Sequence, residues 1–217
     1  MLLYPIFLNL KSRRVVVIGG GEVAERKVRS LLDTGAAITV ISPDLSSELM
    51  SLASAGRIDF QHRNYTPGDC KGASLVLSAT DDPEVNRAVS AEARATGVLL
   101  NTADQPALCD FFMPAIVRRG DLTIAVSTGG SSPALAARLR DDIANVVGEE
   151  YGPLIELLAE VRPEIRRRVV HEADRKALYD QILRSDVLSL FRQHNPEEAT
   201  RRLWMIVEDF VCEGKSS

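Results

Sequence analysis

Three small residues between Gly19 and Ala24 have the spacing of a dinucleotide-binding loop. Gly19, Gly21 and Ala24 match the G-x-G-x-x-A form of this fingerprint. The first glycine permits a tight turn, the second leaves space for a pyrophosphate, and the alanine lets a following helix pack closely on a sheet. The positive end of that helix dipole would face the phosphates. The pattern predicts a nucleotide-binding turn, and the alternative is a glycine-rich turn that binds nothing.

The residues on either side of the fingerprint supply the context that it requires. The β-branched run Val15–Ile18 predicts a strand buried on both faces. Apolar residues then recur at helical spacing, among them Val28 and Leu31, until Gly35 ends the helix. This order of strand, glycine turn and helix favours dinucleotide binding over the empty turn.

A second cofactor contact is expected after the next predicted strand, residues 38–41. Pro43 and Asp44 follow it, and the Asp44 carboxylate could accept a hydrogen bond from a ribose hydroxyl. A carboxylate in the first turn of a helix explains Asp44 equally well. No lysine or arginine follows this strand before Arg57, so a 2′-phosphate would have no partner. The sequence therefore favours NAD over NADP.

Two further loops leave the same predicted edge of the sheet, after the strands 75–77 and 98–100. Thr80 lies in the first loop, where it could contact the nicotinamide half of the cofactor, although a turn with Asp82 as helix cap also explains the segment. Asp104 lies in the second loop and would project towards the crevice. A carboxylate there could take a proton or orient a substrate, and the alternative is an ordinary loop residue.

A second glycine-rich segment, Ser127–Ser132, precedes another predicted helix. Its backbone amides could hold an anion, or the segment is a capped link between strand and helix. Arginines on both sides could pair with a polyanionic substrate or lie in solvent; they are Arg118, Arg119, Arg138 and Arg140. The run Arg166–Arg168 is interpreted as a solvated helix face.

The order of the predicted elements indicates the architecture that positions these residues. Strands and helices alternate between residues 15 and 100, which predicts a doubly wound parallel sheet of the α/β class. The expected strands are 15–18, 38–41, 58–60, 75–77 and 98–100, with helices after Gly21, at 44–53 and at 83–96. A hairpin of 115–118 and 122–126 follows, then a helix at 133–147. Residues 153–211 are helical in pattern, with breaks expected near Pro163, Ser185 and Pro196.

Composition excludes several classes of protein. The net charge of −4 argues against nucleic acid as the main partner. No apolar run is long enough for a membrane span, and the apolar start lacks a preceding basic region, so we expect a cytoplasmic protein. The three cysteines and three histidines are dispersed and suggest neither a disulfide framework nor a metal site.

Taken together, these pieces resemble the N-terminal module of sirohaem synthase, the precorrin-2 dehydrogenase family, some of whose members are also sirohydrochlorin ferrochelatases. The likeness covers nearly the whole chain in the same order. The matching residues are Pro5–Leu8, Val17–Lys27, Ala79–Asp82, Val85–Asn86, Asn101–Asp104, Phe112–Ala115 and Val126–Pro133.

The resemblance implies a Rossmann-like NAD-binding domain at residues 1–112, a small dimerisation region at 113–149 and a C-terminal helical domain at 150–217. It implies a homodimer that binds NAD and a tetrapyrrole substrate. The family likeness places cofactor contacts on Glu22 and Val23 after the turn, and on Pro43 and Asp44 after the second strand.

Asp104 matches the key acidic residue of the family. By this likeness it acts as general base, or positions the macrocycle, while a hydride leaves precorrin-2 for NAD and sirohydrochlorin forms. Thr128 occupies a place where some members carry a serine that can be phosphorylated.

Two functional alternatives stay open. Chelatase activity would need a base rather than a preformed metal site, because a tetrapyrrole brings four nitrogens of its own. A non-catalytic module that senses NAD(H) is the alternative from another class. Such a sensor needs an output element, and the sequence after Asn101 contains neither a basic recognition helix nor an evident docking face.

Overall fold

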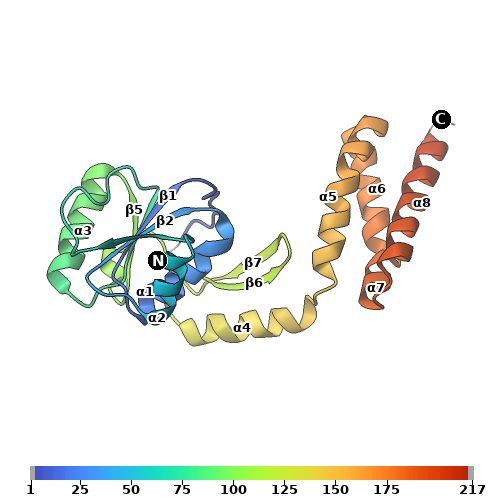
Figure 1. Cartoon of the computed structure of the whole chain (residues 1–217). Helices are drawn as coiled ribbons and strands as arrows, with labels where there is room; N and C mark the ends of the chain where they lie inside the picture. Colours follow the sequence, from blue (N-terminus) through green and yellow to red (C-terminus); the bar gives the residue numbers. More distant parts are fainter. Residues whose placement is uncertain (1–2, 215–217) are drawn as a thin grey trace. The chain divides into compact units, whose positions relative to one another are not determined.

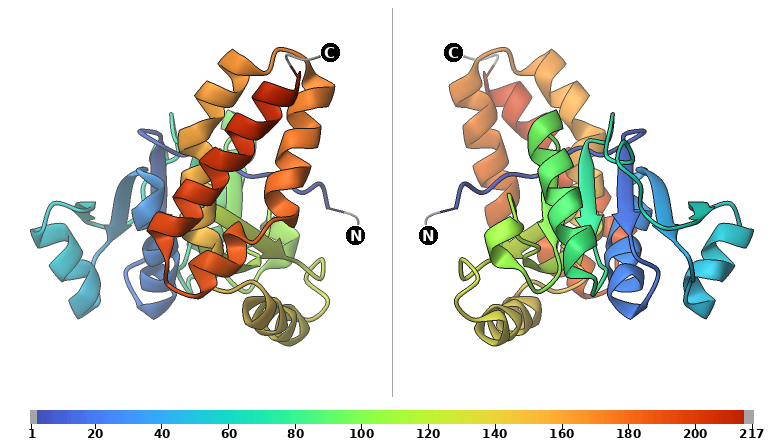
Figure 2. Two further views of the ribbon diagram at one scale, coloured as in Figure 1. Left: turned by 90° about the vertical axis from the view of Figure 1, so that its right-hand side faces the viewer. Right: turned by 90° about the vertical axis from the view of Figure 1, so that its left-hand side faces the viewer.

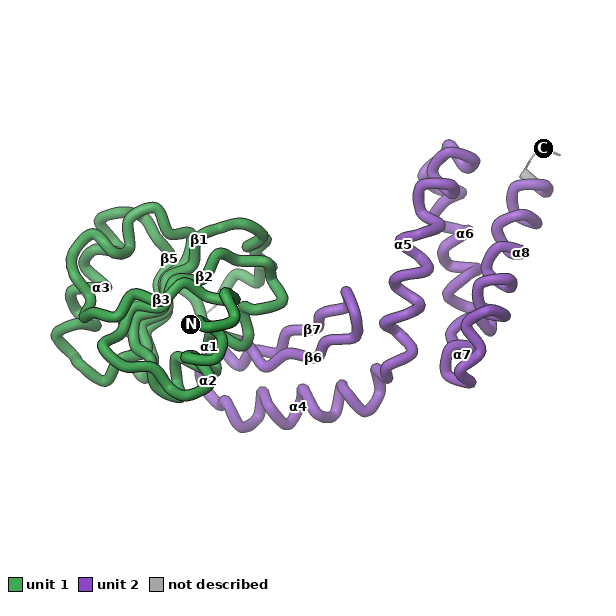
Figure 3. Tube along the Cα trace, in the orientation of Figure 1, with its two compact units in different colours: residues 1–113 green, residues 114–217 purple. Residues whose placement is uncertain are grey.

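The chain forms two compact units, residues 1–113 and 114–217 (Figure 3). The structure is a computed structural model, and it describes residues 3–214. Among these residues, no helix combines the length and the apolar character that crossing a membrane requires.

The first unit is built on a five-stranded parallel sheet (Figure 1). The strand order is β3-β2-β1-β4-β5, so the direction of winding reverses between β1 and β4. In open α/β sheets a ligand binds outside the carboxyl ends of the strands at this reversal. The strands are β1 (Arg14–Ile18), β2 (Ala37–Ser42), β3 (Asp59–His62), β4 (Leu75–Ser78) and β5 (Leu99–Thr102).

Alternate side chains of β1 are buried in cores on opposite faces of the sheet. Val15 and Val17 share one core with apolar residues of α1 (Glu22–Leu31) and α2 (Ser47–Ser54). Val16 and Ile18 belong to the other core, with α3 (Pro83–Thr96). The right-hand view of Figure 2 shows α3, in green, beside the strands. Because both faces are covered, the strand is an unbroken apolar run, and the predicted doubly wound sheet is confirmed.

Local sequence signals fix the ends of these helices. Asp82 caps α3 by accepting hydrogen bonds from the backbone N–H groups of Glu84 and Val85, and Pro83 occupies the first turn. Gly97 ends α3 in the left-handed conformation, with φ 68°. The 3₁₀ turn η1 (Leu32–Thr34) extends α1 as far as Gly35.

Helix α2 begins later than its sequence pattern predicts, at Ser47 rather than at Asp44. The Ser46 hydroxyl accepts a hydrogen bond from the Leu49 N–H at 3.3 Å and so caps the helix there. Pro43 and Asp44 consequently remain in the loop at the edge of the sheet.

The second unit begins with the predicted hairpin, β6 (Ala115–Arg119) and β7 (Leu122–Val126), followed by α4 (Pro133–Val146). Ser132 caps α4 as expected. The Arg119 side chain donates to the carbonyl oxygens of Ala144 and Val147, at 3.1 and 3.0 Å, and so satisfies the C-terminal end of α4.

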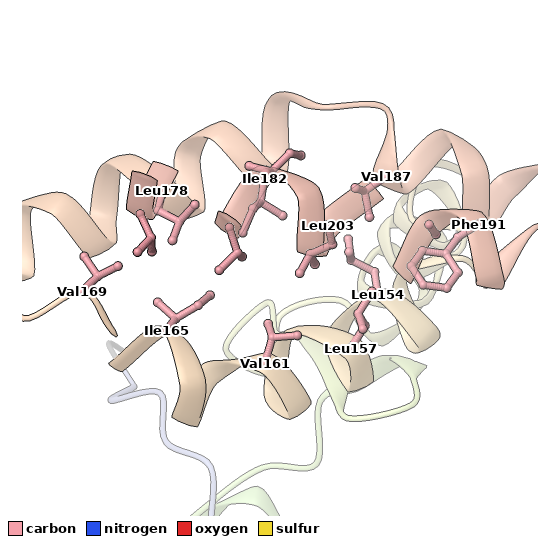
Figure 4. Packing of buried hydrophobic residues seen from close by; sticks show 14 residues of the cluster. Leu154, Leu157, Val161, Ile165, Val169, Leu178, Ile182, Val187, Phe191 and Leu203 are labelled. Carbon is pink, nitrogen blue, oxygen red and sulfur yellow. The ribbon is translucent and has the colours of Figure 1, made fainter. Parts of the chain in front are cut away.

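Four helices complete this unit and enclose one apolar core (Figure 4). They are α5 (Tyr151–Arg168), α6 (Glu172–Arg184), α7 (Val187–Arg192) and α8 (Pro196–Gly214). Figures 1 and 2 both show these helices, in orange to red, side by side. Residues such as Val161, Ile165 and Leu178 are fully buried between them.

The break expected near Pro163 is wrong, because α5 runs through this proline. Proline removes one backbone donor and frees the carbonyl four residues earlier, here that of Ala159. Both residues are exposed, so water can satisfy that carbonyl. The chain instead leaves the helix after Arg168, and α6 starts at Glu172.

Candidate cofactor and active site

A cleft of about 860 Å³ lies in the first unit, where the loops after β1, β2, β4 and β5 meet. It occupies the carboxyl edge of the sheet at the reversal of strand order. The structure brings together around it all the site residues predicted from the sequence, which are Gly19, Gly21, Glu22, Val23, Pro43, Asp44, Thr80 and Asp104.

The three glycines of the first loop meet different steric demands. Gly19 has φ +108°, and a Cβ atom there would lie 2.4 Å from the Ala79 carbonyl oxygen. A Cβ on Gly20 would lie 1.9 Å from the Asp44 carbonyl oxygen, a constraint that the fingerprint did not indicate. A Cβ on Gly21 would meet nothing within 4 Å. The first two glycines therefore allow the loops to approach, while the third leaves its space to a ligand.

Helix α1 presents an uncapped N-terminus to this cleft. Its N-cap is Gly21, which has no side chain to occupy the first amides, whereas Ser46 and Asp82 cap α2 and α3. Unsatisfied N–H groups and the positive end of the helix dipole together form an anion site. This is the place at which the fingerprint predicts a pyrophosphate.

Hydrogen bonds tie the first two loops of the cleft to each other. The Gly19 N–H donates to the Ile41 carbonyl at 2.9 Å, and the Ser46 N–H donates to the Gly20 carbonyl at 2.8 Å. The Ser46 hydroxyl also donates to Glu25 of α1 at 2.8 Å. The exposed residue Asp44 is therefore carried by a loop that is fixed against the glycine turn.

A buried polar pair fixes the loop that carries Thr80. The Ser78 hydroxyl donates to Asn86 Oδ1 at 2.6 Å, and Asn86 Nδ2 donates to the Thr80 carbonyl at 3.1 Å. Ser78 and Asn86 are almost completely buried. This role of Asn86 was not predicted from the sequence, although Asn86 is one of the residues that match the family and is a polar residue on the apolar side of a helix.

Asp104 lies at the mouth of the cleft in an unusual backbone conformation. Its φ is 55°, in the left-handed region, where a residue other than glycine costs ~1–3 kcal/mol. The neighbouring Ala103 N–H donates to the Ser78 carbonyl at 2.8 Å, which ties this loop to the end of β4. The side chain of Asp104 itself is exposed.

The Cys109 side chain bonds to residues on both sides of Asp104 and so holds this loop together. The Cys109 thiol donates to the Thr102 carbonyl at 3.2 Å and lies 3.5 Å from the Gln105 carbonyl, while the Thr102 N–H donates to the sulfur. Residues on both sides of Asp104 are thus bonded to one side chain. No role for Cys109 was predicted from the sequence.

Tyr65, from the loop after β3, also lines the cleft, and it was not predicted. Its hydroxyl donates to Glu92 of α3 at 2.6 Å, and Glu92 also accepts from the Cys70 N–H at 2.9 Å. Burial, with the Glu92 carboxylate beside it, raises the pKa of Tyr65. Its ring is therefore a fixed, neutral wall of the cleft.

The charged side chains that line the cleft are all acidic. They are Glu22, Asp44, Asp81, Asp82 and Asp104. This negative field suits a cationic group such as an oxidised nicotinamide, and it opposes an additional phosphate near Asp44.

The second glycine-rich segment is bonded to itself. Thr128 donates its hydroxyl to the Ser132 carbonyl at 3.0 Å, and the same hydroxyl accepts from the Ser132 N–H at 3.1 Å. Arg138 and Arg140 pair with neighbouring aspartates, and Arg119 is engaged at the end of α4. Arg167 and Arg168 pair with Glu164 and Glu208. In residues 3–214 no group of histidine, cysteine or carboxylate side chains has the arrangement of a metal site.

Three family models match consecutive parts of the chain. Residues 6–115 match a putative NAD(P)-binding family, residues 119–145 the central region of sirohaem biosynthesis proteins, and residues 150–204 the sirohaem synthase dimerisation region. The last match falls on residues that the sequence analysis assigned to the helical domain.

Curated relatives and a solved structure agree with these matches. Siroheme synthase of Methylococcus capsulatus is 39% identical over 92% of this chain and 42% of its own length. Siroheme synthase of Nitrosomonas europaea is 42% identical over 82% of this chain and 38% of its own length. The chain thus spans about two fifths of these relatives. The solved structure of SirC, precorrin-2 dehydrogenase, matches 94% of this chain and 100% of its own, with a TM-score of 0.76 and 29% identity.

Proposed function

The chain belongs to the family formed by the NAD(P)-binding, central and dimerisation regions of sirohaem synthase, and we propose that it is an NAD-dependent precorrin-2 dehydrogenase. The product is sirohydrochlorin, so the enzyme serves sirohaem biosynthesis. The observation that carries the proposal is the position of Asp104 at the mouth of a dinucleotide cleft, in a chain of which 94% matches the structure of a precorrin-2 dehydrogenase. We place the reaction in the cytoplasm.

The residues of the cleft fit NAD. The amides at the start of α1 and the open space at Gly21 would hold the pyrophosphate, and Asp44 would accept from a ribose hydroxyl. Thr80 would contact the nicotinamide half. When bound, NAD would supply the hydride acceptor for the reaction.

Dehydrogenation removes a hydride and a proton from precorrin-2. NAD would accept the hydride, and a base would take the proton. Asp104 either takes that proton or orients the macrocycle. The buried pair Ser78–Asn86 and the Cys109 thiol hold the two loops that face the reacting atoms.

This proposal is tested by mixing the purified chain with precorrin-2 and NAD and recording the absorption spectrum. We expect the spectrum of sirohydrochlorin to appear together with that of NADH. Binding of NAD without turnover would contradict the proposal and would favour the NAD(H)-sensing alternative.

Cofactor preference is a second expected result. The value of kcat/KM should be at least about tenfold higher with NAD than with NADP, because a 2′-phosphate would lie beside Asp44 among other carboxylates. Steady-state kinetics with both cofactors measure this ratio. Asp44→Asn is the matched variant and should lower the ratio of kcat/KM with NAD to kcat/KM with NADP. A preference of the unaltered chain for NADP would refute the assignment of Asp44.

The quaternary structure gives a third expected result. The dimerisation-region match and the exposed apolar residues Leu135 and Leu139, one turn apart on α4, support a homodimer. Sedimentation at micromolar concentration should show a dimer. Leu135→Asp should weaken it, and Arg138→Gln, at an exposed position of the same helix, should not. A monomeric unaltered chain would contradict the expectation.

A further inference from the structure

Lys27 of α1 is a partly buried lysine whose side chain contacts Asn101, just before the loop that carries Asp104. Its Nζ donates to Asn101 Oδ1 at 2.5 Å, which joins α1 to the end of β5. Asn101 is buried, and its Nδ2 donates in turn to the Phe111 carbonyl at 2.9 Å. The lysine therefore anchors the residue from which the Asp104 loop departs.

Asp104 needs such an anchor because its backbone is strained. A non-glycine residue at φ 55° persists only where its surroundings hold it. Three contacts hold the segment. Asn101, with its partners Lys27 and Phe111, fixes the start; the Ala103 N–H donates to the Ser78 carbonyl; and the Cys109 thiol fixes the end. Lys27 is the positively charged group among these contacts.

The charge of Lys27 acts on the same loop. Burial lowers the pKa of Lys27, and the neighbouring positive charge of Arg26 acts in the same direction, while the charges of Cys109 and Asp104 oppose this effect. Lys27 thus interacts electrostatically with Asp104. The other charged groups that face the cleft with Asp104 are the carboxylates Glu22, Asp44, Asp81 and Asp82. The ammonium group of Lys27 attracts the Asp104 carboxylate, which these other carboxylates repel.

We propose that Lys27 is a positioning residue for Asp104: through its hydrogen bond to Asn101 it fixes the start of the loop that carries this carboxylate. This inference rests on the proposed dehydrogenase function. It assigns to α1 a second task besides presenting its N-terminus to the cofactor.

The test compares Lys27→Met with Lys27→Arg. In Lys27→Met, kcat for precorrin-2 should fall by about 10–100-fold, because the carboxylate is misplaced. The Kd for NAD should stay within about twofold. Lys27→Arg retains a charged donor for Asn101 Oδ1 and should restore part of the kcat that Lys27→Met loses.

Arg26→Met is the matched control, since it removes one positive charge from an exposed position on the same turn of α1. It should leave kcat unchanged. An unchanged kcat in Lys27→Met would overturn the proposal, and so would an equal loss of kcat in Arg26→Met. Thermal unfolding of each variant establishes that it is folded.

A readout without catalysis separates this inference from the proposed function. Alkylation of Cys109, followed by peptide mass spectrometry, should be several-fold faster in Lys27→Met, with the exposed residue Cys212 as internal reference. An unaltered chain without dehydrogenase activity refutes the proposed function. A Cys109 alkylation rate that Lys27→Met leaves unchanged refutes the anchoring role of Lys27, whatever the activity of the unaltered chain.

Discussion

Replacing Asp104 by alanine should lower the rate of precorrin-2 dehydrogenation by about 10²–10⁴, or roughly 3–5.5 kcal/mol of barrier, with the fold and NAD binding retained. The reason is that, among the described residues that line the cleft, Asp104 is the carboxylate carried by the loop after β5. Stopped-flow absorption and NAD titration measure the two effects separately.

The backbone of Asp104 decides which further variants are informative. Alanine is unfavourable at φ 55°, whereas glycine accepts this conformation readily and asparagine accepts it more easily than alanine. Asp104→Gly removes the carboxylate without a backbone penalty, and it should be as inactive as Asp104→Ala. Asp104→Asn retains the shape but accepts no proton. An active asparagine variant would show that Asp104 orients the macrocycle, and normal turnover in all three variants would refute any role in the reaction.

The variant Gly21→Asp should abolish NAD binding. A carboxylate there would occupy the space kept open above α1 and would repel the pyrophosphate at the helix N-terminus. Since a Cβ on Gly21 meets nothing within 4 Å, the variant should fold normally. Isothermal titration with NAD measures the loss, and circular dichroism checks the fold.

Two neighbouring substitutions separate the loss of the ligand from the loss of the fold. Gly21→Ala adds only a methyl group in open space, so it should bind NAD more weakly than the unaltered chain but stay folded. Gly20→Ala should instead destabilise the protein, because its Cβ would overlap the Asp44 carbonyl at 1.9 Å. Unchanged NAD affinity in a folded Gly21→Asp protein would remove the basis for the cofactor assignment.

The parts of the site that follow from a strand, a glycine or a helix cap were predictable from the sequence. The run Val15–Ile18 is β-branched because both of its faces are buried, and Gly19 marks a turn that only glycine permits. Asp82 caps its helix as its sequence context indicates. These signals are local, so a few neighbouring residues suffice to express them.

The residues that support the site act through side-chain contacts outside their own helix or strand, and they were not predicted from the sequence. Lys27 and Asn101 are 74 positions apart, and nothing in the helical pattern of α1 distinguishes Lys27 from a solvated lysine. The Cys109 thiol bonds across a loop whose left-handed residue is an aspartate, not a glycine. Pro163 was misjudged for a related reason, because its effect depends on whether the freed carbonyl faces water.

The most direct test of the account is a single-turnover reaction in which NADH and sirohydrochlorin are quantified in the same sample. With the purified chain in excess over precorrin-2 and with saturating NAD, we expect both products at one rate and in a ratio of one to one. This ratio follows from transfer of one hydride for each macrocycle oxidised. Formation of sirohydrochlorin without NADH, or tight binding of NAD with no change in the tetrapyrrole spectrum, would contradict the account.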